Sequence, residues 1–206
     1  MQNLFYNLLS APSNVCQAYW QELTAAYNEP HRAYHTLDHI RHLIEQIQAV
    51  EPFLQNRTAV YLAAFYHDCI YDPARTDNEF QSGQLARKRL TATGIPEAAV
   101  QRVVELIEAT RQHEAAGLAD AALFLDADLS ILGAPPRQYQ DYTVQIRMEY
   151  SQYPDAVYQA GRAQVLRSFL DKPSVFQTAF FRDRYEAAAR RNLKQELRHL
   201  SGFSVD

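Results

Sequence analysis

The stretch Leu62-Ala63-Ala64-Phe65-Tyr66-His67-Asp68-Cys69-Ile70-Tyr71-Asp72 is an apolar run that ends in an adjacent histidine and aspartate. We expect a helix over residues 57–71, because apolar residues recur there at helical spacing and few polar side chains interrupt them. Neighbouring helical residues point about 100° apart, so His67 and Asp68 can reach one ion above the helix. A buried carboxylate needs such a partner, because an unpaired one is costly. The pair is therefore the first candidate for metal binding.

The rest of the chain also shows helical periodicity. Further helices are expected over residues 14–28, 37–51, 77–90, 97–114, 137–150, 155–170 and 174–200. Thr36 is a plausible N-cap of the second of these. The run at 121–125 favours a short helix, although its length also fits a strand. No segment alternates apolar and polar residues over the length of a strand, so the sequence predicts an all-α fold. We expect one domain over residues 1–206, since no boundary is better marked than the loop at 133–136.

Composition excludes several classes of protein. The chain has 206 residues, 47% of them hydrophobic and 21% charged, with 6 glycines, which argues against a disordered or fibrous protein. A net charge of -4 offers no electrostatic footprint for nucleic acid or an anionic membrane surface. The apolar runs are too short for a membrane span, and the first residues do not resemble a secretion signal. We expect a cytoplasmic protein in which Cys16 and Cys69 are reduced.

Additional candidate ligands lie elsewhere in the chain. His35 and His39 flank one expected helix start, His113 lies near a helix end, and Asp126 and Asp128 follow an apolar run. Imidazoles and carboxylates suit Mn, Fe, Co, Ni or Zn, and the lack of clustered cysteines argues against a closed structural zinc site. A single histidine on a half-buried helix is more often packed than metal-bound, and Asp126 is better explained as a cap or surface partner. The remaining histidines, expected at the surface, are His31, His42 and His199.

The order His39, then His67-Asp68, then Asp128 resembles the HD superfamily of metal-dependent phosphohydrolases. The separation of 67 − 39 = 28 residues between the two histidines is typical of that pattern. A closer resemblance, to the predicted HD phosphohydrolase family, covers nearly the whole chain. It rests on RAYHTLDHI at 32–40, FYHDCIYD at 65–72, NE at 78–79, TRQH at 110–113, DADLSILG at 126–133, IRMEY at 146–150 and RNL at 191–193.

This resemblance implies an HD-like helical bundle with additional C-terminal helices. It also implies a mononuclear site in which one divalent ion, Mn, Fe, Co, Ni, Zn or Mg, is held by four ligands. These implied ligands are His39, His67, Asp68 and Asp128. HD enzymes with two metals carry extra histidines between the His-Asp pair and the last aspartate. Here that interval contains only His113, which we therefore expect as a substrate contact or an occasional ligand.

The expected chemistry is hydrolysis of a small phosphoester, for which a nucleotide is one candidate. A divalent ion binds a phosphate oxygen and lowers the pKa of its water, and hydrolysis also needs an acid or base. Asp72 is the first candidate, because it lies four residues after Asp68 and shares its helix face if the helix continues that far. Related enzymes carry an acid there or one position earlier, where this chain has Tyr71. Glu79 is the second candidate.

Cationic side chains are the candidates for phosphate recognition, because a guanidinium stays charged and binds phosphate through two hydrogen bonds. The candidate substrate contacts are Arg32, His35, Arg111, His113 and Arg147. Arg147 and Glu149 are equally consistent with a structural ion pair. Two alternatives to hydrolysis stay open: a catalytically silent HD protein that binds metal and nucleotide, and an HD oxygenase with two irons.

Overall fold

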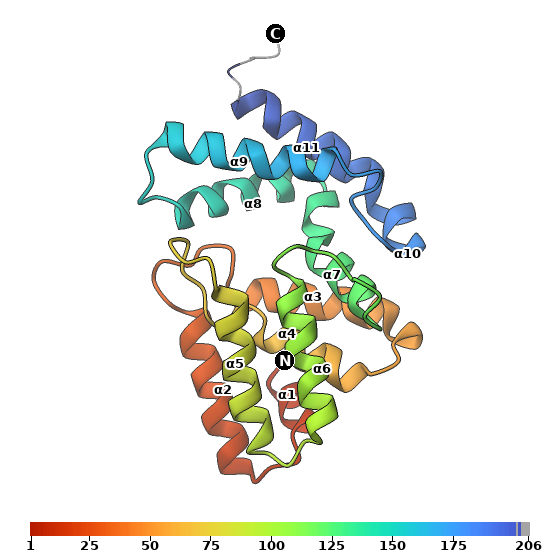
Figure 1. Cartoon of the computed structure of the whole chain (residues 1–206). Helices are drawn as coiled ribbons and strands as arrows, with labels where there is room; N and C mark the ends of the chain where they lie inside the picture. The colour runs from red at the N-terminus through yellow and green to blue at the C-terminus, as the bar shows by residue number, and fades with distance from the viewer. Residues whose placement is uncertain (201, 203–206) are drawn as a thin grey trace. The chain divides into compact units, whose positions relative to one another are not determined.

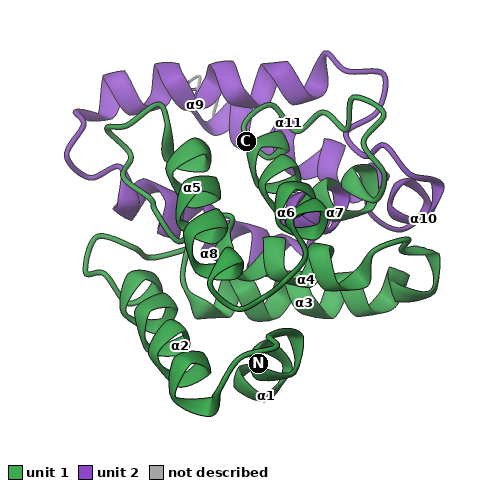
Figure 2. Cartoon of the chain, turned by 60° about the horizontal axis from the view of Figure 1, so that its bottom comes forward, with its two compact units in different colours: residues 1–125 green, residues 126–206 purple. Residues whose placement is uncertain are grey.

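The computed structural model describes residues 1–200 and residue 202, and every regular element in that part of the chain is helical (Figure 1). The prediction of an all-α fold is confirmed. The chain divides into two compact units, residues 1–125 and 126–206 (Figure 2). The single domain stays a prediction, because compactness alone does not show whether either unit folds by itself. Within the described residues, no helix is both long and apolar enough to cross a bilayer.

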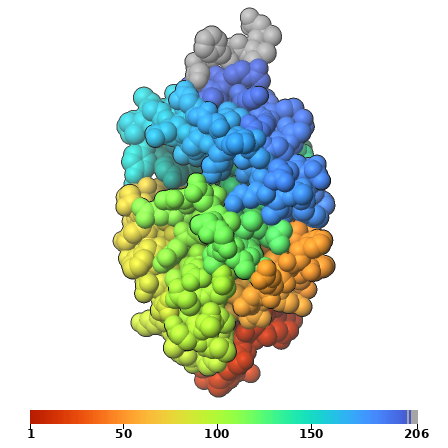
Figure 3. All heavy atoms as spheres, turned by 45° about the vertical axis from the view of Figure 1, so that its right-hand side comes forward, coloured from red at the N-terminus to blue at the C-terminus, as the bar shows by residue number. Residues whose placement is uncertain are grey.

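Unit 1 is built around α4 (Arg57–Tyr66), in which every residue from Ala59 onward is buried. Asn56 caps this helix, since its side chain accepts a hydrogen bond from the Ala59 amide. The helices packed against α4 are α1 (Gln2–Leu8), α3 (Leu37–Val50), α5 (Asn78–Thr91) and α6 (Glu97–Ala109). The unit also contains α2 (Ser13–Tyr27), η1 (Glu51–Phe53) and the first residues of α7 (Ala121–Asp128). Figure 3 shows the heavy atoms on one face of the chain, where the residues of unit 1 are coloured from red to green.

Helix α3 forms as the sequence predicts. The Thr36 side chain accepts a hydrogen bond from the Asp38 amide, which confirms the predicted N-cap. The buried stripe of this helix includes Ile40, Leu43 and Ile47, each fully buried. His39 belongs to the buried residues of the same helix. The packing that orders α3 therefore also places one predicted metal ligand inside the unit.

Helix α4 ends at Tyr66, so the predicted extension to residue 71 is wrong. Side chains take the carbonyl oxygens that the next helical turn would use. The His67 ring nitrogen Nδ1 lies 3.0 Å from the Ala64 carbonyl, and the Tyr27 hydroxyl donates to the Phe65 carbonyl at 3.0 Å. Residues 67–70 form a turn instead. The expectation that Asp72 shares a helix face with Asp68 fails with the helix.

Helix α6 is also shorter than predicted, ending at Ala109 instead of residue 114. The Thr110 hydroxyl donates to the Ile107 carbonyl at 2.7 Å, and the backbone then turns. His113 has a φ of 53°, a left-handed conformation that a continuing helix does not contain. The TRQH segment therefore lies in a turn after the helix, not in its last turn.

The predicted helix over 174–200 is interrupted at its start. Residues 174–178 are not helical, because two carboxylates hold their backbone amides. Glu186 accepts from the amides of Val175 and Phe176, while Asp126 accepts from those of Gln177 and Thr178. The helical part consists of α10 (Ala179–Phe181), a π-helical turn η3 (Arg182–Glu186) and α11 (Ala187–Leu200).

Unit 2 also contains η2 (Leu129–Gly133), α8 (Pro136–Glu149) and α9 (Asp155–Leu170), and its helix α11 packs against α9, η2 and η3. Asp126 is a buried hydrogen-bond acceptor in this unit and not a surface partner. It also accepts from the Thr178 hydroxyl at 2.6 Å. Burial raises the pKa of this carboxyl, although the hydrogen bonds from Thr178 and Gln177 oppose the increase.

Gly133 is a glycine for steric reasons. A Cβ atom at this position would lie 2.6 Å from Tyr185 Cβ and 2.8 Å from the Tyr185 carbonyl oxygen. We expect Gly133→Ala to lower the free energy of unfolding by about 1–3 kcal/mol, measured by urea titration. Gly161→Ala in α9 is the matched control, since nothing lies within 4 Å of its Cβ position. There alanine should stabilise by about 0.5–1 kcal/mol through helix propensity. A Gly133→Ala protein as stable as the wild type would contradict the packing.

Candidate metal centre

Two buried imidazoles face each other in unit 1. His39 comes from α3 and His67 from the turn after α4, and their Nε2 atoms lie 3.1 Å apart. The carboxylate of Asp68 lies against both rings. Its Oδ2 is 2.9 Å from His67 Nε2 and 3.6 Å from His39 Nε2. Three potential ligand atoms from two segments of the chain thus gather at one point.

The tautomer of His67 follows from its hydrogen bond. A carbonyl oxygen can only accept, so the contact between His67 Nδ1 and the Ala64 carbonyl places a proton on Nδ1. In the neutral ring Nε2 then carries a lone pair directed at His39 and Asp68. Metal-bound histidines are oriented in the same way, by a backbone carbonyl that takes the other N–H. The nitrogen pair is satisfied by a shared proton or by a cation.

The distances fit a cation. Nitrogen and oxygen atoms bound to one ion at about 2.0–2.2 Å, with bond angles of about 90–109°, are separated by about 2.8–3.6 Å. The three separations among His39, His67 and Asp68 are 2.9, 3.1 and 3.6 Å. The donor set and its spacing therefore suit a divalent transition metal.

Asp128 adds a further carboxylate. It is the last residue of α7, a helix that begins at Ala121 in unit 1 and continues without a break past Leu125. His39, His67 and Asp128 each offer one ligand atom, and these atoms lie within 4.8 Å of one another. This group could hold a metal ion. The resemblance to HD phosphohydrolases implies all three as ligands, together with Asp68.

The electrostatics of the turn favour an ionised carboxylate beside a protonated thiol. Burial alone would raise the pKa of Asp68, but the imidazoles of His67, His35 and His39 outweigh it and hold that pKa well below its usual range. Burial raises the pKa of the neighbouring Cys69 thiol to about 12. The Asp68 carboxylate, which lies 2.9 Å from His67 Nε2 and 3.6 Å from His39 Nε2, is the candidate ligand of this turn.

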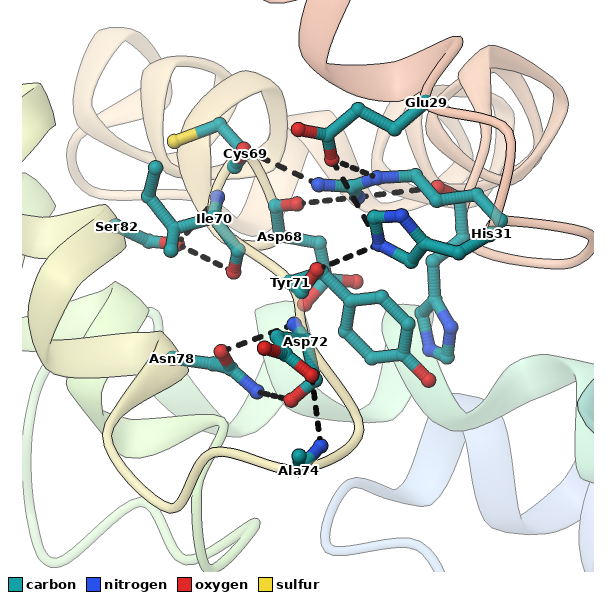
Figure 4. Close-up of polar contacts among 12 residues, drawn as sticks. Glu29, His31, Asp68, Cys69, Ile70, Tyr71, Asp72, Ala74, Asn78 and Ser82 are labelled. Carbon is teal, nitrogen blue, oxygen red and sulfur yellow. Dashed lines mark hydrogen bonds and ion pairs between the residues drawn. The ribbon is translucent and has the colours of Figure 1, made fainter. Parts of the chain in front are cut away.

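Arg32 is buried beside the metal centre and engaged with the protein. Its guanidinium donates to the Glu29 carboxylate and to the carbonyls of His35, Asp68 and Cys69. Figure 4 shows Asp68 and Cys69 in the neighbourhood of Glu29. His35 lies near the ligands, with its ring centroid 5.7 Å from that of His39. Contact of either residue with a phosphate stays a prediction.

The two acid/base candidates lie after the turn. Asp72 is exposed, and its Oδ1 accepts from the Ala74 amide at 2.8 Å. The Asn78 side chain accepts from the Asp72 amide at 3.1 Å and donates to its carbonyl at 2.9 Å, as Figure 4 shows. Asp72 therefore shapes the connection to α5. Glu79 is half-buried in the first turn of α5. Catalytic roles for both stay predictions.

The remaining candidate substrate contacts lie farther along the chain. Arg111 is exposed and His113 half-buried, both in the turn after α6. Arg147, in unit 2, forms an ion pair with Asp155 at 2.6 Å and donates to the carbonyls of Tyr150 and Tyr153. It thereby supports the connection between α8 and α9. A phosphate-binding role for these three residues stays a prediction.

Sequence reasoning missed the side chains that hold the turn. Tyr27 donates to the Phe65 carbonyl, and the Ser82 hydroxyl accepts from the Ile70 amide at 3.1 Å and donates to its carbonyl at 3.3 Å. Both hydroxyls act on backbone atoms that are distant in sequence. No local pattern distinguishes such a tyrosine or serine from others in an amphipathic helix.

Comparison of the chain with models of protein families, with curated proteins and with solved structures finds no significant match. The resemblance to HD phosphohydrolases therefore depends on the motifs quoted above.

Metal binding should stabilise the folded protein. After EDTA treatment and dialysis, addition of Mn²⁺, Co²⁺ or Zn²⁺ at 100 times its Kd should add about 2.7 kcal/mol to the free energy of unfolding and raise the Tm. His67→Ala should abolish most of this shift, because it removes a ligand. His199→Ala, at an exposed position of α11, should retain the shift. Equal responses of the two variants would locate the bound metal elsewhere.

The two cysteines should report on the integrity of the fold. Cys16 is 3% exposed and Cys69 1% exposed, so neither thiol is accessible in the folded chain. We expect negligible reaction with a thiol reagent such as DTNB in native buffer and two reactive thiols per chain in urea. Rapid labelling of Cys69 in the native protein, identified by peptide mass spectrometry, would contradict the described turn.

Proposed function

We propose that this chain is a metal-dependent phosphohydrolase that cleaves a small phosphoester. The observation that carries the proposal is the 3.1 Å separation of the two buried Nε2 atoms, with the Asp68 carboxylate against both rings. Such a mixed nitrogen and oxygen donor set suits catalytic metals more than closed structural sites. The resemblance of the surrounding motifs to HD phosphohydrolases supports phosphoester hydrolysis as the reaction.

Each residue of the site has a distinct part in this proposal. A divalent ion here would supply Lewis acidity toward a phosphate oxygen and would lower the pKa of water. His39 and His67 would hold the ion as neutral imidazoles, with the His67 tautomer set by the Ala64 carbonyl. Asp68, and Asp128 at the end of α7, would supply the negative charge that retains it.

The substrate would be met by groups next to the ligands. His35 lies close enough to His39 to donate a hydrogen bond toward a phosphoryl oxygen beside the ion. Asp72, and after it Glu79, are the groups proposed to move a proton to or from the reacting oxygens. A nucleotide is one candidate substrate, because it is a small molecule that carries a phosphoester.

A phosphoester screen tests this function. Metal-loaded protein should hydrolyse p-nitrophenyl phosphate, its bis ester or a nucleotide with Mn²⁺, Co²⁺, Ni²⁺ or Mg²⁺. Asp68→Asn keeps the side-chain volume but removes the charge. It should lower the rate of hydrolysis by more than the about 10- to 100-fold that is typical when a residue outside the ligand set is changed. Asp38→Asn, at an aspartate whose side chain is 83% exposed, should keep full activity.

Other outcomes would identify the alternatives. A metal-loaded protein that is stabilised by a nucleotide but forms no product with any metal would be a silent binding protein. Two irons per chain by elemental analysis, together with oxygen consumption, would indicate an oxygenase. Either result would overturn the hydrolase proposal.

A further inference from the structure

We propose that Arg32 is a positioning residue of the metal centre, which sets metal affinity by holding the His67–Asp68 turn from the loop before α3. The inference rests on the metal centre of the proposed function but not on hydrolysis. It gives Arg32 a part different from that of a phosphate contact.

The contacts of Arg32 lie on the backbone of the turn. Its Nη1 donates to the Asp68 carbonyl at 2.7 Å and its Nη2 to the Cys69 carbonyl at 3.2 Å. Helix α4 has already ended, so these carbonyls have no amide of a following helical turn. A buried carbonyl without a donor is costly. Arg32 thus satisfies the backbone of the same residue whose carboxylate faces His67 and His39.

The guanidinium itself is fixed in place. Its Nε donates to Glu29 Oε2 at 3.0 Å, and its side chain is 0% exposed. The rings of Tyr27 and Tyr71 lie against it, with centroids 5.2 and 5.4 Å from Cζ. Leaving this position would remove the ion-pair partner of the half-buried Glu29 and would leave the Asp68 and Cys69 carbonyls without their donor. These contacts hold the guanidinium in one position, and we refer to Arg32 with its Glu29 ion pair as the strut.

The strut also reaches the segment that leads to the other ligand. Arg32 Nη1 donates to the His35 carbonyl at 3.2 Å, four residues before His39. One side chain therefore ties the start of α3, which carries His39, to the turn that carries His67 and Asp68. Ser82 and Tyr27 hold Ile70 and Phe65 on either side of that turn. Loss of Arg32 would leave free the carbonyls next to the metal ligands.

Metal titration without any phosphoester tests the inference. Arg32→Lys keeps the charge but loses the planar fork that reaches two carbonyls at once. We expect Co²⁺ to bind about 10- to 100-fold more weakly, as for other outer-shell changes, and its visible absorption spectrum to change with the ligand geometry. Glu29→Gln, which keeps Arg32 but removes its ion-pair partner, should weaken Co²⁺ binding in the same direction and by less.

Arg89→Lys is the matched control. Arg89 also lies in unit 1, forms a two-bond ion pair with Glu22 at 2.7 and 2.6 Å, and lies over the ring of Tyr19. Its replacement should lower the Tm but leave the Co²⁺ affinity and spectrum unchanged. If Arg32→Lys fails to fold, the Co²⁺ affinity of Glu29→Gln is compared with that of Arg89→Lys instead.

The outcomes separate this inference from the proposed function. Unchanged Co²⁺ affinity and spectrum in Arg32→Lys would overturn it, and a raised KM alone would make Arg32 a phosphate contact. Equal weakening in Arg89→Lys would also overturn it, as a general effect of stability. Wild-type protein that binds no Co²⁺ would overturn both proposals. Metal binding that depends on Arg32, without any turnover, would support this inference and defeat only the hydrolase.

Discussion

The approach of His39 Nε2 to His67 Nε2 is the constraint on which the site depends. Two buried ring nitrogens with an adjacent carboxylate form an unfavourable group unless a proton or a cation lies between them. Helices α3 and α4 are packed against each other and bury many apolar residues, and the two histidines are buried with them. The hydrogen bond from His67 Nδ1 to Ala64 then sets the direction of the remaining lone pair. The fold thus places the donor atoms of His39, His67 and Asp68 at one point, which is the arrangement a bound cation would need.

Periodicity predicts most of the helices, and the predicted bounds of α9 match the structure, whereas the ends of α4 and α6 and the start of α10 do not follow from it. Helix α3 begins at a local signal, the Thr36 cap, and that signal can be read from adjacent residues. The end of α4 depends instead on Tyr27, which bonds a carbonyl 38 residues away. The break before α10 depends on Asp126, which bonds amides 51 and 52 residues away. Propensity and spacing contain no information about such partners, so helix ends set by distant side chains escape a reading of the sequence.

The candidate ligands could be named from the sequence, whereas the roles of the residues around them depend on the tertiary structure. The resemblance to HD phosphohydrolases implies His39, His67 and Asp128 as ligands, and the structure brings their potential ligand atoms within 4.8 Å of one another. The helix-face argument for Asp72 requires α4 to continue beyond Tyr66, and the turn removes that argument, while a catalytic role for Asp72 stays a prediction. Arg32 was selected as a phosphate contact from its chemistry alone. What decides the position of its charge is burial against Glu29, Tyr27 and Tyr71, which only the tertiary structure shows.

The net charge of the proposed metal site bears on how a phosphate could be recognised. In the proposed site two neutral imidazoles and two carboxylates, Asp68 and Asp128, would neutralise one divalent ion. A neutral centre exerts little long-range attraction on a phosphate dianion, so cations outside the ligand set must supply it. The charge of Arg32 is already paired with Glu29 and directed at backbone carbonyls. In the proposed function, recognition of the dianion would therefore require other groups, for which His35 and the exposed Arg111 are the candidates. The selectivity of the site would then depend on these groups, whereas its affinity for metal would depend on the strut.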